Sequence, residues 1–439
     1  MVKSSERYPH EDDMNKNLFC ACALGAALAC GAATTNVPLE KAGNLEPWAQ
    51  IIATDTLGVT FFTGGAAYGR ILWRQSETED WKEAVPETID GLIRANGKIQ
   101  RAFIKGFDPK KPVYLKPVSK PIKNFGAYKV DFAEEKEGKV VKLKQPLSPD
   151  GRITIGLVCD LHNNTNRLFP ALSAAGDDLS MCVLMGDQCD APGSAADVIN
   201  NFVTPLKALT EKGLMTLVLR GNHECRGAGA REIPEYIARP NDKFYGAFTL
   251  GCARFVFLDT GEDKPKDHSE YSGLIDFDEY LEEEAEWLKR EVSGDEFRNA
   301  DWRIVFMHIP PREATKEHSY PVTENGARIF APILKGQGVD LVVSAHEHEE
   351  SFLNEEEAKK YDLDFPLLIG AGGSKHKDNT LGLRLEVAPS ELVLPKQDWR
   401  KTKETKSTQE TKKTSEIDDI LSKIGDIWSI FEKNRQKSK

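Results

Sequence analysis

The sequence predicts an α/β protein in which mixed β-sheets are flanked by helices and preceded by an all-β sandwich. Two observations lead to this fold class. From Ile153 onward, short apolar runs bounded by turn residues alternate with helix-length segments, as in buried strands joined by crossover helices. Between Trp48 and Lys144, short runs rich in β-branched and aromatic residues are separated by Gly, Pro and Asp, which indicates antiparallel strands.

The chain has 439 residues, of which 40% are hydrophobic and 29% charged, as is usual for a soluble globular protein. This length favours two folded domains with tails. We expect a leader at residues 1–36, a β-sandwich at 37–148, a larger α/β domain at 149–395, and a polar linker with an amphipathic helix at 396–439. The net charge of -11 argues against general nucleic-acid binding.

The leader has the pattern of an export signal. One Lys precedes an apolar run from Leu18 to Leu28, which is followed by small residues and is too short to span a bilayer. We expect the chain to start at Met14, because the residues before it are polar and charged. The protein would then be periplasmic or at the cell surface. Ala27-Leu28-Ala29-Cys30 also resembles a bacterial lipoprotein box, so a lipid anchor at Cys30 is a second option. The alternative is a cytosolic protein with an apolar N-terminal helix.

Five of the eight cysteines lie outside the leader. Their number is odd and their spacing is not that of a disulfide framework or a zinc ribbon, so we expect buried thiols. A bridge between Cys189 and Cys225 is the alternative.

The sandwich region is locally basic. Residues 98–144 contain thirteen Lys and Arg and five Asp and Glu, a local charge of +8 in an acidic protein. A solvated face of the sandwich is the simpler interpretation, and a surface that binds polyanions is the alternative. The run from Gly91 through Ile104 to Tyr114 resembles the fibronectin-like domain that precedes the catalytic domain of purple acid phosphatases, and it carries no chemistry of its own.

Three buried-strand runs in the α/β domain end in polar loops. ITIGLVC leads into Asp160-Leu161-His162, MCVLM into Gly186 to Asp190, and LMTLVLR into Gly221 to Glu224. Because ligands bind beyond the carboxyl ends of such strands, we expect these three loops to meet at one site.

Further strands follow the same rule. ARFVFLDT, RIVFMH, LVVSAH and PLLIGAG are buried-strand runs, and two of them lead into His308 and into His346-Glu347-His348. Helices are predicted at residues 277–292 and 326–336. LGLRLEV and ELVLP alternate as an antiparallel pair that closes the sheet.

Residues 400–415 have the composition of a disordered linker. Beyond it, apolar residues from Ile417 to Phe431 recur at helical spacing on one face. Docking of this short helix onto its own domain is the simpler interpretation, and self-association or binding of another protein is the alternative.

Taken together, the polar blocks D-x-H, G-D-x-x-D, G-N-H-E, a lone His and A-H-E-H resemble the calcineurin-like metallophosphoesterases in order and spacing. The resemblance covers residues 153–394. It implies two divalent ions, Mn, Fe or Zn, bridged by Asp187. It also implies the remaining ligands, which are Asp160, His162 and His348 for the first ion and Asn222, His308 and His346 for the second.

The resemblance further implies that His223 protonates the leaving oxygen while Asp190 orients its imidazole. The nucleophile would be a hydroxide that bridges the metals, because bound metal ionises water near neutral pH. The other histidines, His268, His318 and His376, lack such a context and are expected to be structural.

The sequence also departs from known patterns. Purple acid phosphatases have Gly in place of His162 and Tyr in place of Asp190, so we expect no tyrosinate-iron colour. Ala345 replaces the usual Gly before the last H-x-H, and its methyl group could shift the loop. Three arginines that follow ligand blocks, Arg167, Arg226 and Arg312, are candidates either for phosphate binding or for surface ion pairs.

We therefore expect an exported metallophosphoesterase that hydrolyses phosphomonoesters or phosphodiesters. One alternative is a metal-binding scaffold without activity, and another is a diesterase specific for nucleotides or sugar phosphates. The loop at residues 261–273 is expected to influence substrate choice.

Overall fold

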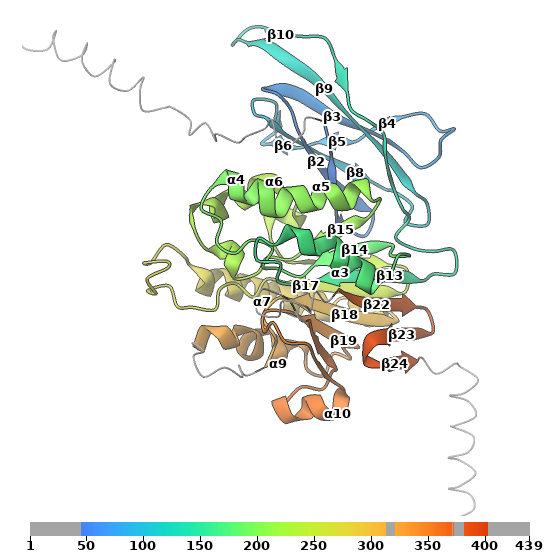
Figure 1. Ribbon diagram of the computed structural model, residues 1–439, viewed down its shortest axis with the longest axis vertical. Helices are drawn as coiled ribbons and strands as arrows, with labels where there is room; N and C mark the ends of the chain where they lie inside the picture. The colour runs from blue at the N-terminus through green and yellow to red at the C-terminus, as the bar shows by residue number, and fades with distance from the viewer. Residues whose placement is uncertain (1–44, 313–320, 371, 373–381, 403–439) are drawn as a thin grey trace, which may run out of the picture. The chain divides into compact units, whose positions relative to one another are not determined.

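Two β-sheets pack face to face at the centre of the fold, and helices cover them (Figure 1). The computed structural model describes residues 45–312, 321–370, 372 and 382–402. Within these residues the first sheet has ten strands and the second has six. This arrangement confirms the predicted class of mixed sheets flanked by helices.

The first sheet contains the three strands that lead into the polar loops. β13, β14 and β15 are parallel neighbours and are buried on both faces, which explains their continuous apolar sequences. In spatial order the strands of this sheet are β24 (Trp399–Thr402), β23 (Glu391–Leu394), β22 (Leu383–Ala388), β13 (Ile153–Val158), β14 (Met181–Leu184), β15 (Met215–Val218), β1 (Trp48–Ala53), β2 (Thr56–Phe62), β8 (Ile99–Lys105) and β5 (Val85–Pro86).

The second sheet carries the later histidines. Its strands β17, β18, β19 and β21 are parallel, with an antiparallel strand at each edge. In spatial order they are β16 (Gly246–Leu250), β17 (Ala253–Leu258), β18 (Trp302–Met307), β19 (Leu341–Ser344), β21 (Leu367–Ile369) and β20 (Ser351–Leu353).

The inner faces of the two sheets share one apolar core. Ile155 and Leu217 of the first sheet belong to the same buried cluster as Phe255 and Phe306 of the second. The rings of Phe255 and Phe306 are stacked, with centroids 5.9 Å apart. Trp302 Nε1 donates to Ala388 O at 2.7 Å, which ties the second sheet to the first. Dense packing of this kind fixes the strand ends that carry the polar loops.

Helices pack on the strands of both sheets. α7 presents Leu281, Leu288 and Val292 to the second sheet and keeps most of its charged residues outside, with Glu284 buried as an exception. The α-helices are α3 (Leu168–Ala175), α4 (Ala195–Val198), α5 (Thr204–Glu211), α6 (Ile233–Tyr236), α7 (Phe277–Ser293), α8 (Asp295–Asn299), α9 (Ala331–Leu334) and α10 (Glu355–Ala358). Two π-helical turns, Ile199–Val203 and Gly326–Phe330, precede α5 and α9. The 3₁₀ turns are Thr165–Arg167, His223–Cys225, Ala228–Glu232, Pro240–Asp242, Pro321–Glu324, Lys359–Tyr361 and Pro395–Gln397.

The N-terminal region is rich in β-strands, as predicted, but part of it joins the first sheet. β1 pairs in parallel with β15 through Gln50 and Thr216, and β2, β8 and β5 continue the sheet from there. Ala49 N donates to Thr210 Oγ1 at 2.9 Å, and Trp48 Nε1 donates to Tyr236 O at 2.8 Å. The sequence predicted a separate sandwich at 37–148, whereas β1 is buried on both faces and therefore lies inside a larger sheet.

The remaining N-terminal strands form a further sheet built on the long strand β9 (Val113–Phe125). Its neighbours are β10 (Val130–Phe132), β3 (Ala67–Arg74), β4 (Lys82–Glu83), β11 (Lys136–Glu137) and β12 (Val141–Leu143). A two-stranded hairpin consists of β6 (Thr88–Ile89) and β7 (Leu92–Ile93). Whether this region is fibronectin-like stays a prediction.

The C-terminal strands agree with the predicted antiparallel pair, because β22 and β23 pair in that way. The structure adds β24, which pairs with β23. Residues 399–402, which the sequence assigned to the polar linker, are therefore part of the first sheet. The leader with Met14 and Cys30, the rest of the linker and the C-terminal helix lie outside the described residues, as do His318 and His376.

Two further findings concern the described part of the chain. No helix there is long and apolar enough to cross a membrane. Cys189 and Cys225 are buried thiols that do not form the alternative disulfide.

Candidate metal centre

The polar loops meet at the carboxyl ends of five strands, β13, β14 and β15 of the first sheet and β18 and β19 of the second. Several residues of these loops adopt a left-handed backbone with φ between 44° and 71°. They are Asp160, His162, Asp187, His346 and His348. Non-glycine residues seldom adopt this conformation, and clusters of it are typical of functional sites.

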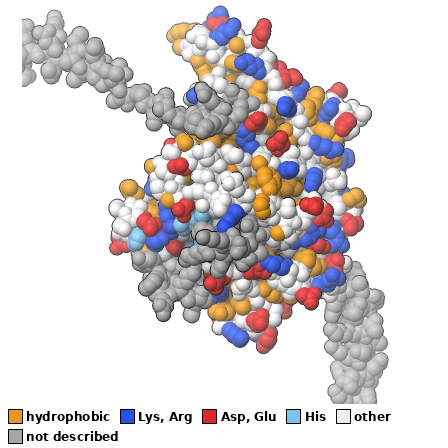
Figure 2. Space-filling view, in the orientation of Figure 1, with side chains coloured by type: hydrophobic (Ala, Val, Ile, Leu, Met, Phe, Trp, Pro, Cys, Tyr) orange, Lys and Arg blue, Asp and Glu red, His pale blue; other side chains and the backbone are white. Residues whose placement is uncertain are grey.

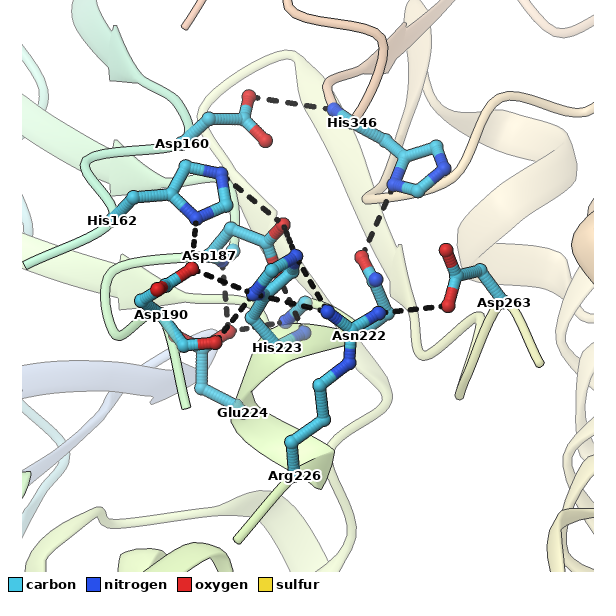
Figure 3. Close-up of polar contacts among 12 residues, drawn as sticks. Asp160, His162, Asp187, Asp190, Asn222, His223, Glu224, Arg226, Asp263 and His346 are labelled. Atoms are coloured by element: carbon cyan, nitrogen blue, oxygen red, sulfur yellow. Dashed lines mark hydrogen bonds and ion pairs between the residues drawn. The ribbon is translucent and has the colours of Figure 1, made fainter. Parts of the chain in front are cut away.

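One group of side chains gathers around Asp160 and Asp187, as Figure 3 shows in part. His162 Nε2 lies 2.9 Å from His348 Nε2, and His348 Nε2 lies 3.6 Å from Asp160 Oδ1. Asp160 Oδ1 is buried and has no hydrogen-bond partner within the described residues. His162 Nδ1 donates to Asp190 Oδ1 at 3.2 Å, which leaves Nε2 with a free lone pair. Nitrogen and carboxylate acceptors therefore converge on one point.

A second group shares Asp187 with the first and adds His308, His346 and Asn222. His308 Nδ1 contacts Met185 O at 2.8 Å, and because a carbonyl can only accept, this nitrogen carries the proton. His308 Nε2 then faces Asn222 Oδ1 at 3.0 Å and Asp187 Oδ2 at 3.2 Å. His346 Nδ1 lies 3.1 Å from the same Asn222 oxygen. Such a set of nitrogen and oxygen acceptors suits a divalent cation.

The charge balance of these groups is visible in their pKa values. Burial raises the pKa of Asp160 to about 8, and repulsion from Asp187 adds to this effect. Burial also opposes ionisation of Asp187, but His308 and other nearby histidines outweigh it and hold the pKa of this carboxyl well below its usual range. Burial lowers the pKa of His308, whereas Asp187 raises it more strongly, to about 10. Two buried carboxylates that lie this close are stable as anions only when positive charge lies between them.

Glu224 fixes the position of the loops without facing the acceptors. It is 1% exposed and accepts hydrogen bonds of 2.8 Å from the backbone N–H groups of Asp187, Cys189 and Gly221. Burial and the charge of Asp187 raise its pKa to about 7. Glu224 is the last residue of the G-N-H-E block, and the sequence predicted no role for it. A carboxylate within a loop that follows a buried strand is the signal that could have identified it.

His223 lies beside the two groups (Figure 3), and its side chain is 22% exposed. Its Nδ1 contacts both the backbone oxygen of Asp190 and Asp190 Oδ1, the latter at 3.1 Å. Its Nε2 accepts from Arg226 Nη1 at 2.8 Å. Burial, Arg226 and His162 lower the pKa of His223 against the opposing charge of Asp187.

Arg226 is held in turn by the loop at residues 261–273. Its Nη2 lies 3.2 Å from Glu262 Oε1 and 2.8 Å from Asp263 Oδ1, and its Nε lies 3.1 Å from Glu270 Oε2. Tyr271 accepts from the same Nε at 3.3 Å. The predicted substrate loop thus reaches His223 through Arg226, a contact that sequence spacing could not reveal.

The structure brings together all nine residues that the sequence predicted for the site. They are Asp160, His162, Asp187, Asp190, Asn222, His223, His308, His346 and His348. Ala345 has a negative φ, which a residue with a side chain adopts without strain, and donates its N–H to His308 O at 2.9 Å. Arg312 forms an ion pair with Glu347 at 2.7 Å and Arg226 a cluster of ion pairs.

A comparison with known families concerns the part of the chain that carries the site. Residues 153–350 match the family model of the calcineurin-like phosphoesterases.

Two relatives extend this result. Purple acid phosphatase 18 of Arabidopsis thaliana is 29% identical over 192 residues, which cover 41% of this chain and 40% of that protein. The chain thus matches less than half the length of this relative. A purple acid phosphatase from yellow lupin (Lupinus luteus) seeds has a similar structure, with a TM-score of 0.56 and 14% identity, covering 82% of this chain and 73% of the other. This structural likeness supports the fold.

Proposed function

We propose that the protein hydrolyses phosphate esters with the help of two divalent metal ions. The observation that carries the proposal is that two groups of metal-ligand side chains share the buried carboxylate of Asp187. A shared carboxylate allows two ions to lie ~3.5 to 4 Å apart, as in dinuclear hydrolases. Asp160, His162 and His348 would complete the first ion, and Asn222, His308 and His346 the second.

When bound, the two ions supply positive charge for the phosphate and lower the pKa of a water molecule so that it can attack. Mn, Fe and Zn all suit nitrogen and oxygen ligands. The side chains of this chain have separate tasks. Asp190 fixes which nitrogen of His162 carries the proton, and the Met185 carbonyl does so for His308. Glu224 holds the loops that carry Asp187 and Asn222.

His223 is proposed as the proton donor to the leaving oxygen. Its side chain is 22% exposed, so a substrate can reach the ring. Asp190 holds the proton on Nδ1, and a donor at Nε2 would then have to be the charged imidazolium. Arg226 Nη1 contacts Nε2 at 2.8 Å, so an ester oxygen that accepts a proton from Nε2 would also lie beside Arg226. In this geometry Arg226 can bind the same oxygen by a charge-assisted hydrogen bond.

The substrate class is proposed only as phosphomonoesters or phosphodiesters. A metal-binding scaffold without activity is the first alternative, but a scaffold does not require a histidine placed beside the ligands. A diesterase specific for nucleotides or sugar phosphates is the second alternative. Export remains a proposal based on the apolar run from Leu18 to Leu28, and so do a lipid anchor at Cys30 and self-association through the C-terminal helix.

Metal analysis combined with kinetics tests the proposed function. We expect two metal ions per chain, loss of ester hydrolysis after chelation, and recovery when Mn, Fe or Zn is restored. A panel of monoesters and diesters then selects between the substrate classes. A folded protein that hydrolyses esters without metal would contradict the proposal, and a protein that binds two ions but hydrolyses no ester would support the scaffold alternative.

A further inference from the structure

The hairpin formed by β9 and β10 ends in an exposed apolar tip, which we define as residues 120–132. Phe125 is 59% exposed, Tyr128 103%, Val130 38% and Phe132 39%. In a soluble protein a single exposed hydrophobic residue is ordinary, whereas a group of aromatic residues on one hairpin marks an interaction surface. This tip is not part of the metal centre.

The pairing of the two strands places Phe125, Val130 and Phe132 on one face. Phe125 is opposite Val130, and Ile122 is opposite Phe132. Residues opposite each other in an antiparallel pair point to the same side. A bulge at Lys123 shifts the register, and it brings Ile122 and Phe125 to the same face although they are three residues apart. The hairpin is therefore amphipathic, and Phe125, Val130 and Phe132 on its apolar face are exposed.

Lysine side chains surround this apolar face. Lys120 Nζ lies 4.8 Å from the centre of the Phe132 ring, so its charge stands directly beside the aromatic group. Lys123 is exposed and has no ion-pair partner among the described residues. Lys129 pairs with Asp131 at 2.7 Å. The tip contains three Lys and one Asp, a local charge of +2 in a protein of net charge -11. Figure 2 shows hydrophobic and basic side chains near each other at the top of the view, where β9 and β10 lie.

We propose that the tip docks onto the surface of an anionic lipid bilayer. Tyr128 and the two phenylalanines enter the interfacial region, where aromatic side chains are stable, and the lysines remain at the level of the head groups. Lysine near an anionic lipid surface is attracted to it, and this attraction adds to the burial of apolar area. The combination of exposed aromatic and basic side chains on one hairpin is explained by this partner.

A second copy of the chain fits the tip less well. β10 is an edge strand, but it has only three residues, and its pairing with β9 is interrupted by the bulge at Lys123 of β9. Short and bulged edge strands are poor templates for pairing with another chain. A lipid surface requires no such backbone pairing.

Vesicle sedimentation of the full-length protein tests the proposal. The vesicles contain either phosphatidylcholine alone or equal parts of phosphatidylcholine and phosphatidylglycerol. We expect stronger binding to the anionic vesicles, and we expect the F125S/Y128S/F132S variant to bind them at least about tenfold more weakly. The K120E/K123E variant should lose the preference for anionic lipid. Leu274→Ser changes an apolar residue that is 76% exposed and lies outside the tip, and this control should bind like the wild type.

A second measurement follows the tip itself. In the Tyr128→Trp variant, tryptophan emission should shift to shorter wavelength when anionic vesicles are added. Because all variants keep the same N-terminal apolar run, its contribution cancels in the comparison. Unchanged vesicle binding by the triple variant would overturn the proposal, and so would equal binding to both kinds of vesicle. If the triple variant instead changes the size of the protein in solution, the tip is a contact between copies and the proposal is wrong.

Discussion

At the scale of single residues, Asp190 contacts two histidines, whereas the sequence predicted a contact with one. Its carboxylate contacts His223 Nδ1 at 3.1 Å and His162 Nδ1 at 3.2 Å, so one side chain orients both the proposed proton donor and a proposed ligand. The sequence predicted that Asp190 orients the imidazole of His223 alone. Asp190→Asn is therefore expected to reduce metal affinity as well as proton donation, and it is a less specific test of the donor than a change of His223 itself.

Replacing His223 tests the proton donor directly. His223→Ala should slow the hydrolysis of alkyl phosphates by ~10²- to 10⁴-fold and that of nitrophenyl phosphates far less, because an alkoxide needs a proton to leave and a nitrophenolate does not. The measurement is steady-state kcat for both esters on variants whose metal content has been verified. Equal slowing of the two esters would assign His223 to substrate or metal binding.

The shared position of Asp187 leads to a different prediction. Asp187→Ala should remove both ions, because this carboxylate belongs to both ligand groups, whereas His162→Ala should mainly weaken one. Metal content after dialysis against increasing chelator distinguishes the two variants, and circular dichroism verifies that both are folded. If the two variants retain the same single ion, Asp187 is not shared.

The sequence predicted which residues meet in the site, because strand ends and short motifs are local features. It could not predict contacts made by side chains that come from other loops. Glu224 was quoted without a role, although it accepts three backbone N–H groups. The contact of Arg226 with His223 depends on how the guanidinium is held by residues 261–273, which is set by tertiary packing.

At the scale of elements, the loop at residues 261–273 contains a carboxyl group whose ionisation is disfavoured by burial. Glu262 is 2% exposed, and burial together with a hydrogen bond to Asp263 raises its pKa to about 9, although Arg226 opposes this shift. A group whose pKa is raised by folding stabilises the protein at low pH and loses this contribution as the pH rises. For Glu262 the loss extends from the usual carboxyl pKa near 4.5 to about 9.

Glu262→Gln should remove this pH dependence, because an amide does not ionise. Between about pH 5 and pH 8 the free energy of unfolding of the wild type should fall relative to that of the variant by on the order of a few kcal/mol. Denaturant unfolding at fixed metal content measures the difference. Glu286→Gln, at an exposed carboxylate of α7 whose pKa Lys289 lowers, should keep a constant difference from the wild type over this range. Parallel curves for wild type and Glu262→Gln would contradict the prediction.

Individual strands were predicted well because a run that is buried on both faces has a distinctive sequence. Their partners were not. β1 has the same apolar character as β13, and nothing in the sequence indicates that it lies beside β15. β24 was assigned to the linker because Trp399–Thr402 is polar and only partly buried, and its pairing with β23 outweighs this composition.

At the scale of the whole molecule, the first sheet runs without a break from the strands that carry the candidate metal centre into the N-terminal region. Gln50 of β1 accepts from Ala238 N at 2.9 Å in addition to the pairing of β1 with β15. Gly58 of β2 packs so closely on Ala238 that a side chain at this position would clash. The N-terminal strands thus help to support the sheet that carries the candidate metal centre.

This continuity limits how the protein can be divided. A fragment of residues 149–402 would expose the backbone N–H and C=O groups along one side of β15, a strand that is apolar on both faces. An open, apolar edge of this kind recruits strands from other molecules. We expect such a fragment to form soluble oligomers or precipitate, as light scattering would show, whereas a fragment that begins at residue 45 should stay monodisperse. The same exposed edge would arise transiently whenever β1 detaches, so the seam between β1 and β15 is where misassembly of the intact chain would begin.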